Sequence, residues 1–93
     1  MDELERYLDD IDSKEAFLMF VSMLRNNWEE SQRREKVSPS SPYGPAVLGW
    51  ENVTIGRFLD AMHAWADGSG EKIPDEPSWK MFAEILYAGK FYE

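Results

Sequence analysis

The chain contains no cysteine, and this absence excludes disulfides and thiolate metal sites. A small domain without covalent cross-links suits a reducing cytoplasm. Long apolar runs are also missing: the longest, Ala16–Val21, is far shorter than the roughly 20 residues that a membrane helix requires. The segment MDELERYLDD is acidic, whereas a secretory signal peptide begins with basic residues. The sequence therefore predicts a cytoplasmic protein without membrane-spanning helices.

Residues that catalysis needs are scarce. His63 is the sole histidine, so neither a histidine metal site nor a serine–histidine pair has its usual partners. The glycines of 68–70 lack the preceding strand and third glycine of a phosphate-binding loop. We therefore predict a protein that is not an enzyme and needs no metal or cofactor. Hydrolysis by paired carboxylates is the least favoured alternative, because no pattern singles out two of the acids.

Negative charge is unevenly distributed along the chain. The net charge is −8, and residues 1–12 hold six acids against the single base Arg6. Such a field repels phosphate backbones and anionic membranes, so we expect neither nucleic acid nor membrane as a partner. It would attract a protein with a basic surface, and Asp9 and Asp10 are candidate contacts for it. The alternative is that these acids cap helices and keep the protein soluble.

Apolar residues recur at helical spacing in four places. A short helix is expected over about 3–10. A second begins after a capping box of Asp12 and Glu15 and extends to about residue 34, with Glu29–Arg33 and Glu30–Arg34 as ion pairs. Thr54 caps a third over about 55–67. The fourth starts at Asp75 or Glu76, has Pro77 in its first turn and ends near Gly89.

These elements predict an all-α protein: a single domain, 1–93, with three main helices and a short N-terminal one in an orthogonal or bundle-like arrangement. Three prolines, three serines and two glycines make 37–49 a long loop. Each helix has one aromatic-rich stripe, and we expect the stripes to be buried against one another. The predicted core comprises Phe17, Phe20, Leu24, Trp28, Phe58, Met62, Trp65, Trp79, Phe82 and Leu86.

The segment Trp50-Glu51-Asn52 stands between the long loop and the third helix. In one interpretation, the indole folds back as a lid over the helical stripe, while Glu51 and Asn52 bind local backbone groups. In the other, Tyr43 and Trp50 form an aromatic patch beside acids, as binding anchors do. Both interpretations are compatible with the sequence, so Tyr43, Trp50, Glu51 and Asn52 are candidate binding residues.

Several short motifs carry a resemblance to a known family. They are Trp50-Glu51-Asn52, Thr54-Ile55, Phe58-Leu59, Ala61, Ala64-Trp65, Pro77-Ser78-Trp79, Phe82-Ala83 and Tyr92-Glu93, with Phe17, Phe20 and Leu24 before them. The pattern resembles a family of small acidic bacterial proteins of unknown function. The resemblance covers nearly the whole chain and is most specific from Trp50 onward. It implies a bacterial, cytoplasmic, helical protein and transfers no catalytic residue.

The leading functional hypothesis is a non-catalytic domain that binds a protein partner through its acidic surface, in an immunity-type or regulatory role. The alternative is a small-molecule or peptide binder that uses the Tyr43–Trp50 loop.

Overall fold

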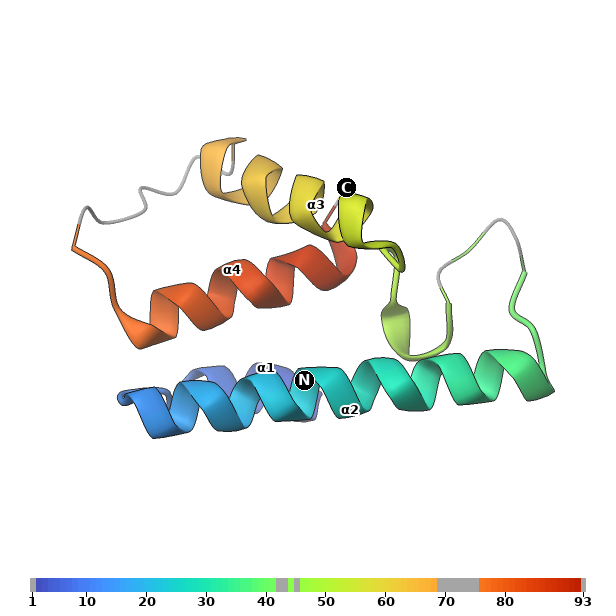
Figure 1. The fold of residues 1–93 in the computed structure, drawn as a ribbon, viewed down its shortest axis with the longest axis horizontal. Coiled ribbons are helices and arrows are strands. Elements are labelled where there is room, and N and C mark those ends of the chain that lie inside the picture. The colour runs from blue at the N-terminus through green and yellow to red at the C-terminus, as the bar shows by residue number, and fades with distance from the viewer. Residues whose placement is uncertain (1, 42–43, 45, 69–75, 93) are drawn as a thin grey trace.

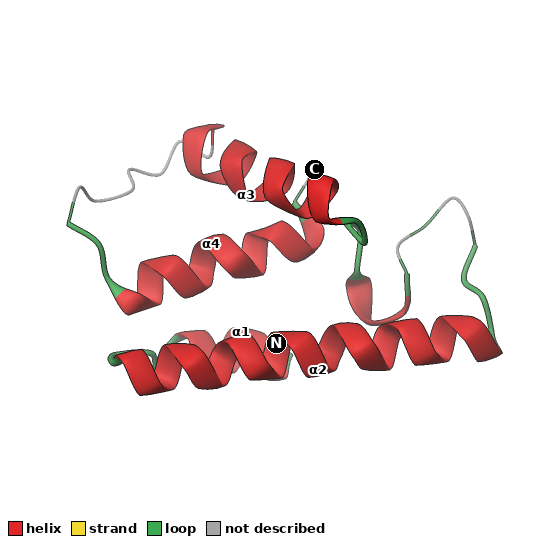
Figure 2. Cartoon of the chain, viewed as in Figure 1, coloured by secondary structure: helices red, strands yellow, loops and turns green. Residues whose placement is uncertain are grey.

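The computed structural model describes residues 2–41, 44, 46–68 and 76–92. Within them the chain forms helices and turns and no strand (Figure 2). The helices are α1 (Glu3–Leu8), α2 (Lys14–Val37), α3 (Ile55–Gly68) and α4 (Trp79–Phe91), with a short 3-10 helix, η1, at Val47–Gly49. The predicted all-α fold, with three main helices and a short N-terminal one, is confirmed.

Helix α4 is the central layer of the molecule. It packs on α1, α2 and α3, and Figure 1 shows it lying between α2 and α3. Helix α1 runs beside α2, whereas α3 packs mainly on α4. The core lies where α1, α2 and α4 meet below the segment that precedes α3. Its buried side chains are Leu4, Ile11, Phe20, Leu24, Trp50 and Ala83.

The N-terminus of α2 differs from the sequence prediction. The Ser13 hydroxyl accepts a hydrogen bond from the amide of Ala16 at 3.1 Å, so Ser13 is the N-cap. The predicted capping box of Asp12 and Glu15 is therefore wrong. Both Asp and Ser are good caps, but Ser13 has the extended backbone that a cap requires, with φ −151° and ψ 164°.

The start of α4 also lies later than predicted. The Ser78 hydroxyl caps this helix by accepting a hydrogen bond from the amide three residues on, at 3.0 Å. Pro77 therefore precedes the cap instead of entering the first turn. A start at Glu76 is wrong, and Asp75 lies outside the described residues. The predicted cap of α3 is confirmed, since Thr54 Oγ1 accepts a hydrogen bond from the Arg57 amide at 3.2 Å.

Ion pairs on α2 follow the prediction only in part. Glu30 pairs with Arg34 at 2.7 Å, as expected, and also with Arg33. Glu29 instead reaches back to Arg25 at 3.5 Å, so the predicted Glu29–Arg33 pair is wrong. Exposed pairs of this kind differ little in free energy, so neighbouring arginines compete readily for the same carboxylate.

Gly89 sets how closely α3 approaches α4. A Cβ atom at this position would lie 2.9 Å from Met62 Cγ and from Phe58 Cζ, closer than real side chains come. The missing side chain lets these two residues of α3 rest on the backbone of α4. The interface between the two helices thus depends on a glycine in the last two turns of α4.

The apolar stripe of α3 is only half buried. Phe58, Met62 and Trp65 are partly covered, whereas the Ile55 side chain is 81% exposed and that of Leu59 is 55% exposed. The expectation that each stripe is buried against the others is therefore wrong for α3. This helix rests on α4 with one side, and α2 does not cover the adjacent side.

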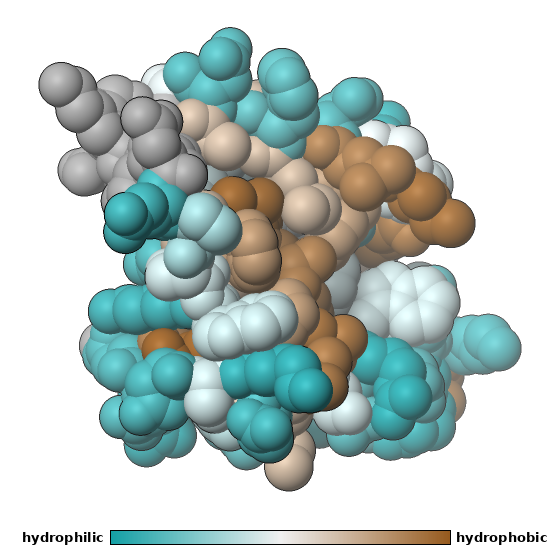
Figure 3. All heavy atoms as spheres, turned by 60° about the vertical axis from the view of Figure 1, so that its left-hand side comes forward, coloured by the Kyte–Doolittle hydropathy of each residue, from teal (hydrophilic) through white to brown (hydrophobic). Residues whose placement is uncertain are grey.

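Two aromatic residues of the predicted core also remain partly exposed. Trp79 and Phe82 lie at the start of α4 and are 38% exposed each. Both contact Phe17 of α2, with ring centroids 5.5 and 6.2 Å away respectively. They form the open end of the α2–α4 interface. Figure 3 shows hydrophobic side chains gathered in a band on one face of the molecule.

Replacing Gly89 with Val is expected to destabilise the domain by about 1–3 kcal/mol, because the new side chain would push against Phe58 and Met62. Urea unfolding measures this loss. The matched control is Gly56→Val in α3, where an added Cβ meets no atom within 4 Å. Equal unfolding free energies for the two variants would contradict a close approach at Gly89.

Candidate functional site

The Trp50 side chain contacts three helices at once. Its indole is 4% exposed, and its Nε1–H donates a hydrogen bond to Asn27 Oδ1 of α2 at 2.8 Å. The ring stacks on Phe58 of α3 with centroids 6.2 Å apart and planes at 24°. The Lys90 Nζ of α4 lies 5.6 Å from the centre of the indole ring. One side chain therefore fixes the relative positions of α2, α3 and α4.

Asn52 holds the C-terminus of α4. Its Nδ2 donates hydrogen bonds to the carbonyl oxygens of Gly89 at 3.1 Å and Tyr92 at 2.9 Å. The main-chain amides of Glu51 and Asn52 both donate to the carbonyl of Lys90, at 3.1 and 3.2 Å. The last carbonyls of a helix have no partner within the helix, and this segment supplies partners for them.

The structure thus favours the lid interpretation of the Trp50 segment. Trp50 is buried and is not an exposed anchor, and Glu51 and Asn52 bind backbone groups of α4. Tyr43 lies outside the described residues. Asp9 and Asp10 follow α1 and are exposed. The Asp10 amide donates a hydrogen bond to the carbonyl of Tyr7 in that helix. Neither residue lines the apolar groove between α2 and α3.

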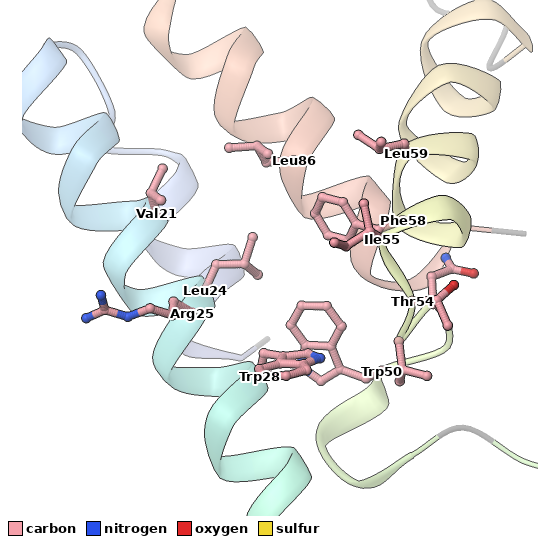
Figure 4. A pocket seen from close by; sticks show the side chains of 12 residues that line it. Val21, Leu24, Arg25, Trp28, Trp50, Thr54, Ile55, Phe58, Leu59 and Leu86 are labelled. Carbon is pink, nitrogen blue, oxygen red and sulfur yellow. The ribbon is translucent and has the colours of Figure 1, made fainter.

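An apolar groove of about 370 Å³ lies between α2 and α3. Figure 4 shows side chains from both helices, from α4 and from the segment before α3 pointing into it. Arg25 is the single charged residue among the described residues that line the groove. The lining consists of Val21, Leu24, Arg25, Trp28, Trp50, Asn52, Val53, Thr54, Ile55, Phe58, Leu59 and Leu86.

The floor and the walls of the groove differ in burial. Leu24 and Trp50 are buried at its floor, and Trp28 and Leu86 are partly covered. The walls are the exposed side chains of Val21 on α2 and of Ile55 and Leu59 on α3. A rigid apolar floor with exposed apolar walls can take up apolar surface from a ligand, and each large side chain it buries contributes roughly 1.5–3 kcal/mol.

The groove was not predicted from the sequence, although a signal was present. On α3, Ile55 and Leu59 lie to one side of the stripe centred on Phe58 and Met62, so the apolar arc is wider than one neighbouring helix covers. Val21 likewise lies beside, not within, the face of α2 that is centred on buried Phe20 and Leu24. An apolar arc that is wider than the core requires indicates an apolar surface that stays exposed.

Groups suited to metal binding or to membrane insertion are not found in the described part of the chain. No three His, Asp or Glu side chains there come close enough to hold a metal ion. No helix there is long and apolar enough to cross a membrane. His63 is exposed and lies outside the groove lining.

A tyrosine of α4 anchors the acidic N-terminal segment. The Tyr87 hydroxyl is 3.2 Å from Asp2 Oδ2 and 3.0 Å from Glu5 Oε1. Burial, and then the hydrogen bond to Glu5 and the charges of the two carboxylates, raise the pKa of Tyr87. Burial lowers the pKa of Lys90, and the nearby charges of Asp2 and Glu5 partly offset this effect. This contact holds α1 on the body of the domain.

Two residues of α2 hold the loop that leads to Trp50. Ser31 is fully buried, and its hydroxyl donates to the carbonyl of Val47 at 2.7 Å. The Glu35 carboxylate accepts hydrogen bonds from the amides of Ser40 at 2.8 Å and Val47 at 2.9 Å. Side-chain and main-chain hydrogen bonds from Ser40, followed by the one from Val47, lower the pKa of Glu35. The loop is thus attached to α2 at two points, Ser40 and the first residue of η1, Val47.

One protein family matches most of the chain, over residues 13–93. The chain belongs to DUF7660, a family of unknown function. The predicted resemblance to a family of unknown function is thereby confirmed. The match begins at Ser13, the N-cap of α2, so α1 precedes the matched DUF7660 region and all groove residues lie within it. No curated protein and no solved structure matches the chain.

Trp50→Phe is expected to cost about 1–2 kcal/mol of stability, because it leaves Asn27 Oδ1 without its donor. Trp50→Ala would cost about 3–5 kcal/mol, because it also opens a cavity between three helices. Urea unfolding followed by circular dichroism measures both. Trp79→Phe, at a partly exposed position, is the control and should change stability less. A Trp50→Ala protein as stable as the wild type would contradict the burial of the indole.

Protonation of Glu35 is expected to release the loop. Because its pKa is lowered in the folded protein, the contribution of this carboxylate is complete above about pH 4.5 and is lost as the pH falls through the lower, folded pKa. The amide proton shifts of Ser40 and Val47 should titrate together with a midpoint below 4.5. Glu35→Gln should abolish that titration, whereas Glu29→Gln should leave it intact. Independent titration of the two amides would contradict a shared carboxylate.

Proposed function

We propose that this DUF7660 protein is a non-catalytic protein-binding domain, and that the groove between α2 and α3 is its main contact surface. The observation that carries the proposal is the exposure of Ile55 and Leu59 beside a floor of buried aromatic and aliphatic side chains. Exposed apolar surface next to a preformed hollow is typical of protein contact sites.

The floor supports this proposal through its rigidity. Trp50 is hydrogen-bonded to Asn27 and stacked on Phe58, so the hollow exists before any partner arrives. A partner side chain that enters it loses little affinity to reordering of the domain. The lining is almost uncharged, which is the pattern of an interface centre with a polar rim.

Protein is a better occupant than a small molecule. The volume of about 370 Å³ falls within the range of small-molecule sites, but such sites bury most of the ligand surface. Here the Ile55 side chain on one wall faces solvent. A small ligand would therefore remain largely exposed, whereas the surface of a protein would cover floor and walls together.

The acidic segment supports a second, weaker contact with a basic partner. The six acids of the segment that comprises the N-cap of α1, α1 itself and the residues up to the cap of α2 are all exposed: Asp2, Glu3, Glu5, Asp9, Asp10 and Asp12. None of them lines the groove. Contacts made by these acids should weaken as salt screens them, whereas contacts made in the groove should persist. A regulatory or immunity-type role, in which the domain acts by binding its partner and performs no chemistry, fits this combination of surfaces.

Leu59→Glu is expected to abolish groove-dependent binding, because it places a charge on the wall of the hollow. Tagged wild-type protein is used to capture proteins from the native host, including untagged copies of itself, at low and high salt. We expect a set of proteins that resists salt and is lost with Leu59→Glu, with affinity reduced about tenfold or more.

The matched control is Val37→Glu, at an 83% exposed position at the end of α2 that does not line the groove. It should retain the whole set of captured proteins. Identical capture by both variants would contradict the proposed function.

A further inference from the structure

We infer that the occupant of the groove is a second copy of this chain, so that the protein forms a two-fold symmetric dimer through the faces of α2 and α3. This inference rests on the proposed function and names its partner. It follows from three properties of the groove face: its charge, its shape and its exposed apolar side chains.

Charge restricts where two copies can meet. Each carries a net charge of −8, so two copies repel each other wherever acids face acids. The groove lining contains no acid among the described residues, and its one base, Arg25, is already paired with Glu29 at 3.5 Å. When two copies meet through this face, no carboxylates of the lining come together, and Arg25 keeps its partner Glu29. The six exposed acids of the N-terminal segment lie outside it.

Shape makes the face complementary to itself. Ile55 projects from the first turn of α3, and the hollow over Leu24 and Leu86 lies directly beside it (Figure 4). A projection and a hollow on one face allow a two-fold rotation to place the Ile55 of each copy in the hollow of the other. Because both contacts form at once, the assembly closes as a dimer and leaves no free end for further addition.

The groove face offers exposed apolar side chains for an interface. Val21, Val53, Ile55 and Leu59 line the groove and are 38%, 42%, 81% and 55% exposed. A standard interface buries about 800 Å² on each partner. A dimer through this face would therefore cover these side chains together with the surfaces of α2 and α3 around them.

The test is the mass of the full chain in solution, measured by sedimentation equilibrium between about 1 µM and about 1 mM, a range that covers weak and moderate dimers. We expect the mass to rise from 10.8 kDa to twice that value with concentration. We also expect association to strengthen in high salt, because salt screens the repulsion between two acidic copies. Association that weakens in salt would overturn an apolar contact.

Ile55→Glu is the diagnostic variant. It should raise the dimer dissociation constant about 30-fold or more, because each charge would enter the hollow of the other copy. The fold is expected to persist, since the position is exposed and a carboxylate in the first turn of a helix is favourable. Circular dichroism checks this, and Val37→Glu should dimerise as the wild type does.

Two results would overturn the inference: a wild-type mass of 10.8 kDa at every concentration, or a dimer that survives Ile55→Glu. If the wild type is monomeric but captures another protein that Leu59→Glu loses, the dimer is wrong and the proposed function stands. If no captured protein depends on Leu59 and no dimer forms, both are wrong.

Discussion

The burial of one indole determines how the three main helices are arranged. Trp50 is hydrogen-bonded to Asn27 of α2, stacked on Phe58 of α3 and covered by Lys90 of α4. The two residues that follow it hold the end of α4 through its free carbonyls. The segment between the long loop and α3 thus connects α2 to α3 in place of a direct contact between the two helices. Without it, α3 would be held among the described elements mainly through α4.

The groove is a consequence of this arrangement. Gly89 lets α3 rest closely on α4, and this contact uses one side of the α3 stripe. Trp50 keeps α3 at a fixed distance from α2, so the other side, with Ile55 and Leu59, stays largely exposed among the described residues. The same contacts that stabilise the fold therefore leave an apolar face in water. A binding role gives that face a physical reason.

Sequence periodicity was enough to predict the four helices and the cap at Thr54, because both are local properties. It placed the starts of α2 and α4 wrongly, because several residues that can cap a helix adjoin each start. Ser13 and Ser78 are the caps, since their backbones have the extended conformation that a cap requires. For Trp50 it left two interpretations, because burial of a loop residue depends on contacts with distant segments. It missed the groove, since a helical wheel shows which residues of α3 are apolar and not how many neighbours cover them. Ile55 illustrates this limit: it belongs to the stripe and is 81% exposed.

The most direct test of an open groove is the solvent exposure of individual methyl groups in dilute, monomeric protein. A soluble paramagnetic agent broadens the NMR signals of exposed methyl groups and spares buried ones. We expect strong broadening for Ile55 and Leu59, little for Leu24, and protection of Ile55 when a partner fills the groove. Ile55 and Leu59 methyl groups as protected as those of Leu24 in the monomer would mean that α3 lies against α2. In that case there is no groove, and the proposed binding surface does not exist.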